Sequence, residues 1–116
     1  MDFLLHRYWH FKDKGFSTDG TKIEPPPAVN AESEIAIFRS VLSSSGDDKL
    51  KSYDLVWLMH LVGDLHQPLH CTARFAKTQK QGDGGNGAKV CATSCRDSLH
   101  TFWDDAPAEA KALLAP

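Results

Sequence analysis

Histidine and aspartate recur at helical spacing in this 116-residue sequence. His60 and Asp64 are four residues apart in the apolar run LVWLMHLVGDL, and the same pair recurs at His100 and Asp104 in LHTFWDD. Residues four apart lie on one face of a helix, so each pair can reach a single ion. A carboxylate among Leu, Val, Met and Trp is costly to desolvate unless a cation or a hydrogen-bond donor meets it. Two such pairs in one short chain favour metal binding.

Two further histidines extend this set. His70 follows a proline after the first pair, and His10 lies between aromatic residues in YWHFKD. Imidazole with carboxylate suits zinc, and a carboxylate can bridge two ions. We therefore interpret six residues as metal ligands: His10, His60, Asp64, His70, His100 and Asp104. Taken singly, each histidine is more often a hydrogen-bonded core or surface residue than a ligand, and we interpret His6 and His66 in this way.

Two helices are predicted in the middle of the chain. Asn30 can cap a helix over residues 31–42, in which acidic residues come early and apolar residues recur at helical spacing. Residues 49–66 are apolar almost all round, which predicts a central, well-buried helix that Pro68 ends or kinks. The first metal-ligand pair would lie on this second helix.

The remaining segments are predicted to be loops and one more helix. Residues 12–30 contain Gly, Ser, Asp and three consecutive prolines, which predicts an extended loop. Residues 77–87 are a polar, glycine-rich loop, and residues 88–95 are expected to be extended. Residues 98–115 are predicted to be helical with an interruption at Pro107. The predicted fold class is mainly α.

The composition excludes several classes of protein. The chain is 41% hydrophobic with a net charge of −2, which suits one small domain over residues 1–116. It lacks the broad basic face of a nucleic-acid-binding protein, so phosphate binding would need another source of positive charge. No apolar run approaches the roughly 18 residues of a membrane span, so no membrane partner is predicted. The first residues lack the features of a signal peptide.

The three cysteines are weak indicators of function. Cys71, Cys91 and Cys95 do not form a pair of CxxC zinc knuckles. They are compatible with a local bridge between Cys91 and Cys95 or with three small buried thiols. A thiolate ligand set ranks below both.

Other catalytic patterns are absent or misleading. Residues 82–87, GDGGNG, match GxGxxG, but no apolar strand precedes them and no convincing helix follows, so a dinucleotide site is not predicted. We interpret them as a loop that can expose backbone N–H groups. The chain has no His-Asp dipeptide for a phosphohydrolase of that kind and no Gly-x-Ser-x-Gly for a serine hydrolase.

Four motifs together resemble the S1/P1 nuclease family, zinc-dependent nucleases that prefer single-stranded nucleic acid and act on 3′-nucleotides. The motifs are WHFKD, HLVGDLHQPLH, GDGGN and LHTFWD, and their order and spacing match the family from about Tyr8 to Asp105. The resemblance implies a mainly α, helical fold with long loops, shared with zinc-dependent phospholipases C. The complete family site holds three zinc ions.

The resemblance also assigns the ligands and the substrate. One zinc would take His10, His60 and Asp64, with Asp64 bridging to a second ion, and another would take His70, His100 and Asp104. Phe11 lies where the family stacks a nucleobase, although core packing would explain it equally well. Asp13 lies where a carboxylate hydrogen-bonds the base edge, although it could equally be a solvated loop residue. The implied reaction is phosphodiester hydrolysis by a zinc-activated water, with the 3′-oxygen leaving.

The chain departs from the family before Tyr8. The family begins its mature chain with a zinc-binding tryptophan, followed by a histidine ligand and an aspartate ligand. We find none of these, so we expect this chain to correspond to the C-terminal part of the nuclease domain, with one or two zinc ions and weak or absent activity. The alternatives are an inactive zinc-binding structural remnant and, ranked lower, a phospholipase C activity. The family resemblance implies a secreted or periplasmic protein, and no oligomeric state is predicted.

Overall fold

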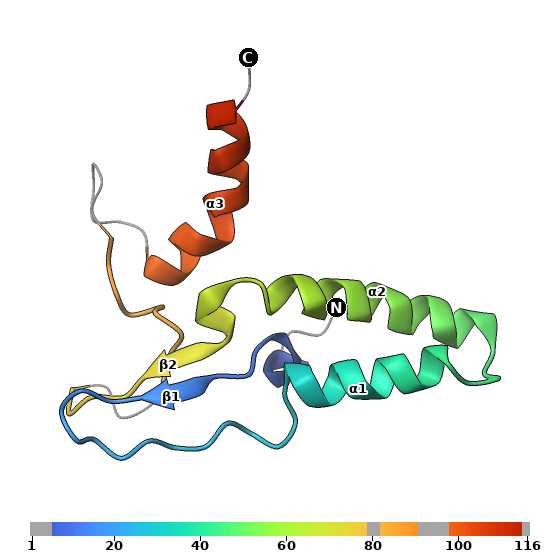
Figure 1. Cartoon of the computed structure of the whole chain (residues 1–116), viewed down its shortest axis with the longest axis horizontal. Coiled ribbons are helices and arrows are strands. Elements are labelled where there is room, and N and C mark those ends of the chain that lie inside the picture. The colour runs from blue at the N-terminus through green and yellow to red at the C-terminus, as the bar shows by residue number, and fades with distance from the viewer. Residues whose placement is uncertain (1–5, 79–81, 91–97, 115–116) are drawn as a thin grey trace.

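The structure is a computed structural model that describes residues 6–78, 82–90 and 98–114. Helices dominate it and strands are few, so the predicted mainly α fold class is confirmed (Figure 1). In chain order the elements are η1 (Arg7–His10), β1 (Lys14–Phe16), α1 (Ala31–Leu42), α2 (Asp48–Asp64), η2 (Pro68–His70), β2 (Thr72–Arg74) and α3 (Leu99–Leu114).

Helix α1 begins where the sequence predicts. The side-chain oxygen of Asn30 accepts hydrogen bonds from the backbone N–H groups of Glu32 and Ser33, and the Ser33 hydroxyl accepts one from the Asn30 N–H. This reciprocal cap satisfies three donors that have no partner inside the helix. The predicted helix over residues 31–42 is therefore confirmed.

Helix α2 packs against α1 and η1 around an aromatic core. Phe38 of α1 and Trp57 and Leu61 of α2 are buried, with Trp9 of η1 packed against them. The rings of Trp9 and Trp57 meet edge to face with their centroids 4.9 Å apart, a favoured aromatic geometry. This core fixes η1 beside the last turns of α2.

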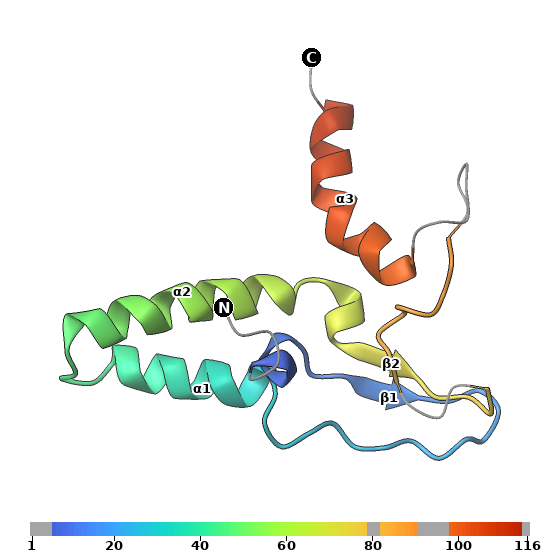
Figure 2. The same cartoon turned by 180° about the vertical axis from the view of Figure 1, so that it is seen from behind.

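The prediction that α2 is buried all round is wrong. Val56 and Met59 are 64% and 69% exposed, whereas Leu61 is fully buried. Within the described residues, α1 and η1 cover only one side of the helix, because they lie along the same face (Figures 1 and 2). The apolar composition of α2 therefore predicts more buried side chains than the structure shows. The helix ends at Asp64, and Pro68 opens the short helix η2 after it.

The prediction of an extended loop over the whole of residues 12–30 is also wrong in part. Lys14–Phe16 forms β1, which pairs in parallel with Thr72–Arg74 of β2. The N–H of Lys14 donates to the Cys71 carbonyl over 2.9 Å, which extends this pairing toward η2. The partner strand is more than fifty residues away, so local sequence carries no sign of it.

Helix α3 stands apart from the α1–α2 pair in both views (Figures 1 and 2). It runs from Leu99 to Leu114 without a break, so the predicted interruption at Pro107 is wrong. A proline removes one helical hydrogen bond, but the alanines around it have the highest helix propensity and allow the helix to continue. No helix in the described part of the chain is long and apolar enough to span a membrane.

Candidate metal centre

Three of the predicted ligands meet where η1 touches the end of α2. His10 Nδ1 lies 3.1 Å from His60 Nε2 and 3.0 Å from Asp64 Oδ2. His60 Nε2 lies 3.1 Å from the same carboxylate oxygen. We call His10, His60 and Asp64 the first group.

Local structure explains how this group forms. His60 and Asp64 are one helical turn apart on α2, so they share a face as the spacing predicts. Trp9 inserts into the core between α1 and α2, and this contact places the next residue, His10, against Trp57 and His60. The first group is therefore positioned by the hydrophobic core itself.

The second group comprises His70 on η2 and His100 and Asp104 on α3. One ligand atom from each of them can be chosen so that all three lie within 4.8 Å of one another. The two histidine Nε2 atoms each lie 3.6 Å from an oxygen of Asp104. The imidazole rings of His70 and His100 stack with their centroids 4.9 Å apart.

Asp64 lies between the two groups. Its Oδ2 faces His10 and His60, whereas its Oδ1 lies 3.9 Å from His70 Nδ1. Its side chain is only 17% exposed. A carboxylate can bridge two cations, and the resemblance implies that Asp64 bridges the ion of the first group to a further ion.

Hydrogen bonds to backbone carbonyls orient two of the histidines. His70 Nδ1 lies 2.7 Å from the His10 carbonyl oxygen, and His100 Nδ1 lies 2.9 Å from the Gly84 carbonyl oxygen. A carbonyl can only accept, so these contacts favour the tautomer with the proton on Nδ1, which leaves the Nε2 lone pair of a neutral ring for a metal. This arrangement is the usual support for a metal-binding imidazole.

The residues fit a zinc ion by their chemistry and spacing. In a tetrahedral zinc site with bonds of about 2.0–2.1 Å, neighbouring ligand atoms lie about 3.3 Å apart. The three contacts of the first group, 3.0–3.1 Å, come close to this value, and those of the second group are somewhat longer. Without a cation, His10 Nδ1 and His60 Nε2 compete for the same carboxylate oxygen. Both groups could therefore hold a metal ion.

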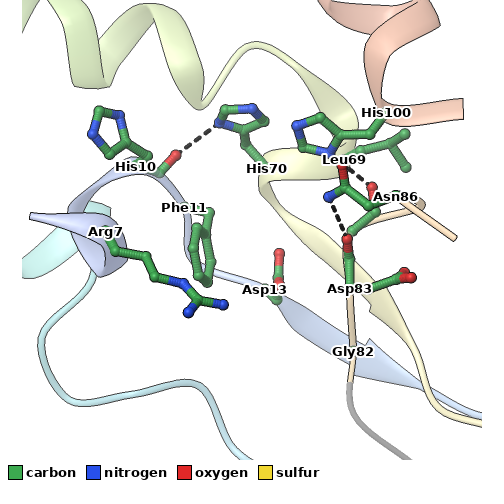
Figure 3. A pocket seen from close by; sticks show the side chains of 11 residues that line it. Arg7, His10, Phe11, Asp13, Leu69, His70, Gly82, Asp83, Asn86 and His100 are labelled. Carbon is green, nitrogen blue, oxygen red and sulfur yellow. Dashed lines mark hydrogen bonds between the residues drawn. The ribbon is translucent and has the colours of Figure 1, made fainter. Parts of the chain in front are cut away.

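A cavity of about 680 Å³ opens beside these groups (Figure 3). Phe11 and Asp13 line it together with His10, His70 and His100. Phe11 meets Tyr8 edge to face but is not part of the buried core. The structure thus brings both predicted substrate-binding residues to the same cavity as the predicted ligands.

Asp13 is not the solvated loop carboxylate that was one interpretation of the sequence. Its Oδ1 is buried and has no hydrogen-bond partner among the described residues. Burial raises its pKa from 3.8 to about 6, and the nearby Asp83 carboxylate adds to this rise, while His70 and His100 oppose it. A buried acceptor without a partner is suited to meeting a donor from a ligand.

The other singled-out residues lie outside the two groups. His6 stacks on Trp57 with centroids 5.3 Å apart, and His66 Nδ1 contacts the Val62 carbonyl over 2.6 Å, so neither joins a group. Cys71 is a partly buried free thiol whose pKa is raised by burial and by the charge of Asp13. Cys91 and Cys95 lie outside the described residues.

Sequence reasoning missed Gln67 and misjudged the glycine-rich loop. Gln67 donates from its amide nitrogen to Asp104 Oδ1 over 2.8 Å, and its position in HQPLH gives no sign of this partner. The loop does not expose the N–H groups of Gly85 and Gly87, because the Asp83 carboxylate accepts both. The prediction that the loop exposes N–H groups is therefore wrong for these two glycines, and an aspartate before two glycines is a signal for such a turn.

Comparison with known proteins places the chain in a family. The family described as S1/P1 Nuclease matches residues 4–113, which is nearly the whole chain. No curated protein and no solved structure matches it. The match includes every residue of both groups and of the cavity, and on this basis the chain belongs to the S1/P1 nuclease family.

Proposed function

We propose that this protein is a zinc-dependent nuclease that hydrolyses phosphodiester bonds in single-stranded DNA or RNA and acts on 3′-nucleotides. The observation that carries the proposal is the meeting of the six predicted ligands in two groups of three, with Asp64 of the first group also facing His70 of the second. Family membership supports hydrolysis of nucleic acid as the reaction.

The first group would hold one zinc ion and the second group another, and the resemblance assigns Asp64 to a further ion beside that of the first group. Zinc at these positions would lower the pKa of water and stabilise negative charge on the phosphoryl oxygens. Asp64 is the proposed catalytic residue because, together with His10 and His60, it would hold the zinc ion of the first group. A cation cluster also explains how a chain of net charge −2 binds a polyanion.

Phe11 and Asp13 would bind the base. The Phe11 ring lines the cavity and can stack on a base that is free of a duplex, which supports a preference for single strands. The partnerless Asp13 Oδ1 can accept a hydrogen bond from the edge of that base. Asp13 lies between Phe11 and Asp83 in the cavity, below His70 and His100, so base and phosphate could be held together (Figure 3).

The experiment that tests this function combines metal analysis with a cleavage assay. Protein prepared with zinc should contain one to two ions per chain and should cut single-stranded DNA or RNA weakly and in a chelator-sensitive way. Asp64→Asn should abolish cleavage, whereas His66→Asn, on the same stretch but outside both groups, should leave it intact. Absence of zinc after such a preparation would refute the proposal.

A catalytically inactive zinc scaffold is the second candidate. One observation favours it. Among the described residues, α3 contacts the rest of the chain mainly through η2 and the glycine-rich loop, yet it carries two ligands of the second group. Small domains with limited cores often use metal in this way. Zinc-dependent melting without cleavage would support the scaffold.

Two further assignments belong to the proposal. A phospholipase C activity ranks lower, because Phe11 and Asp13 line the cavity as the nucleotide-binding version of the motif implies. The family is generally secreted, and we assign this protein to the same location. Hydrolysis of a phosphatidylcholine substrate in place of nucleic acid would instead support the phospholipase C activity.

A further inference from the structure

The glycine-rich loop at residues 82–87 is closed by one side chain. Asp83 Oδ1 accepts the Gly85 N–H over 3.0 Å, and Asp83 Oδ2 accepts the Gly87 N–H over 2.8 Å. Asn86 donates from its side chain to the Asp83 carbonyl over 2.7 Å. The N–H groups of Gly85 and Gly87 are thus turned toward Asp83, and the carbonyl groups of Gly84, Gly85 and Ala88 face α3.

These carbonyl groups receive the first turn of α3. The Ala88 carbonyl accepts the Leu99 N–H over 2.7 Å, and the Gly85 carbonyl accepts the His100 N–H over 3.4 Å. The Gly84 carbonyl accepts from the His100 side chain, with 2.9 Å between oxygen and Nδ1. The loop therefore holds both the backbone and the ring of His100.

Only glycine suits residue 84. Its φ is +59°, in the left-handed region that side chains rarely adopt. A Cβ there would lie 2.7 Å from the Leu69 backbone carbonyl oxygen and 3.4 Å from His100 Nδ1. The Leu69 backbone, which blocks this space, cannot move aside as a flexible side chain could. A side chain at residue 84 would therefore displace the Gly84 carbonyl from His100.

We propose that the Asp83-closed loop is a positioning device that holds His100 in its Nδ1–H tautomer, with the Nε2 lone pair directed at the second group. His100 Nε2 lies 3.6 Å from Asp104 Oδ2, on the side of the ring away from Gly84. Asp83 is a positioning residue, since it acts on His100 through the loop backbone. The consequence for zinc binding rests on the proposed function, whereas the tautomer itself does not.

The test is nitrogen NMR of the histidine rings in the zinc-free full chain. At pH 8, above the ordinary histidine pKa of about 6.5, long-range ¹H–¹⁵N correlations distinguish the two neutral tautomers. A His100→Asn variant assigns the signal. We expect Nδ1–H for wild-type His100, and a shift toward Nε2–H in Gly84→Ala and in Asp83→Ala.

A matched glycine provides the control. Gly20 also has a positive φ, +80°, but a Cβ there meets nothing within 4 Å. Gly20→Ala imposes a comparable backbone strain away from the site, so it should leave the His100 tautomer unchanged. If Gly84→Ala does not fold, Asp83→Asn, which keeps one acceptor and loses the other, takes its place.

The second readout is zinc affinity by chelator competition. Loss of an outer hydrogen-bond partner typically weakens a metal site by about 10–100-fold. Gly84→Ala and Asp83→Ala should lower the affinity for one zinc ion by that factor, and Gly20→Ala should leave the affinity for zinc unchanged. An Nε2–H tautomer in the wild type, or an unchanged tautomer in both loop variants, overturns the inference. A wild type that holds Nδ1–H but binds no zinc overturns the proposed function and supports the tautomer assignment.

Discussion

Asp64 has two carboxylate oxygens that face different histidines. Oδ2 lies 3.0–3.1 Å from His10 and His60, and Oδ1 lies 3.9 Å from His70. Helical spacing predicts the contact with His60, because that pair lies within one helix. It does not predict the distances to His10 and His70, which depend on how η1 and η2 pack. The sequence could suggest these partners only by resemblance to a family.

Removal of the His60 side chain should weaken or abolish the binding of one zinc ion. His60→Ala deletes one of three ligand atoms in the first group, so zinc content should fall by about one ion per chain, or that ion's affinity should drop by at least 10-fold. Metal analysis after dialysis against a weak chelator measures this. His66→Ala is the control, because His66 belongs to neither group and its side chain hydrogen-bonds the Val62 carbonyl. Equal losses in the two variants would contradict the assignment.

Asp13 should make the metal-free protein less stable as the pH rises through weakly acidic values. Its pKa is raised from 3.8 to about 6 chiefly by burial, so the folded chain keeps a proton that the unfolded chain releases. The free energy of unfolding should therefore fall between about pH 3.8 and pH 6. Urea denaturation of the wild type and of Asp13→Asn, in the presence of a chelator and at several pH values, measures this dependence of the unfolding free energy on pH.

The Asp13→Asn variant should lack that part of the slope and should be more stable than the wild type at pH 7. Zinc should reverse the wild-type behaviour, because a nearby cation favours the ionised carboxylate and lowers its pKa. The ¹³C signal of the Asp13 carboxyl should titrate near pH 6 without zinc and at lower pH with it. A midpoint near 4 in the chelated protein would show that Asp13 is solvated.

At the scale of the elements, local signals succeed where contacts are local. The Asn30 cap and the apolar spacing after it predict α1 to the residue, because both act within one or two helical turns. The pairing of β1 with β2 joins segments more than fifty residues apart, and no local pattern encodes it. The burial of α2 depends on which neighbours cover it, so its apolar composition alone could not determine its exposed side.

The two sides of α2 should respond differently to truncation. Leu61→Ala opens a cavity in the core and should cost about 2–5 kcal/mol of unfolding free energy. Met59→Ala, on the exposed side of the same helix, should change it by no more than about 0.5 kcal/mol. Urea denaturation of both variants provides the comparison. Similar losses at the two positions would mean that another surface covers Met59 in solution.

At the scale of the whole molecule, α3 depends on few contacts. Its first turn is held by the Gly84–Ala88 backbone, by the Gln67–Asp104 hydrogen bond and by the second group. The α1–α2 pair instead shares a buried aromatic core. The two parts should therefore differ in how strongly they depend on metal.

Chelation should loosen α3 before it affects the α1–α2 pair. Binding only to the folded arrangement stabilises it, so removing zinc from the second group should raise hydrogen exchange in α3 by at least 10-fold. Amides in the buried part of α2, around Trp57, should change much less. Hydrogen exchange with and without chelator measures both. Uniform loss of protection would show that the ions support the entire fold.

His10 serves both groups with different atoms. Its ring faces Asp64 and His60, and its backbone carbonyl accepts the Nδ1 proton of His70. Any shift of η1 therefore disturbs both groups at once. An ion that binds the His10 ring in the first group would also fix the His10 carbonyl, which orients His70 in the second group. The two proposed zinc positions should therefore be thermodynamically linked, and their occupancy should rise together in a titration, with a Hill coefficient above one.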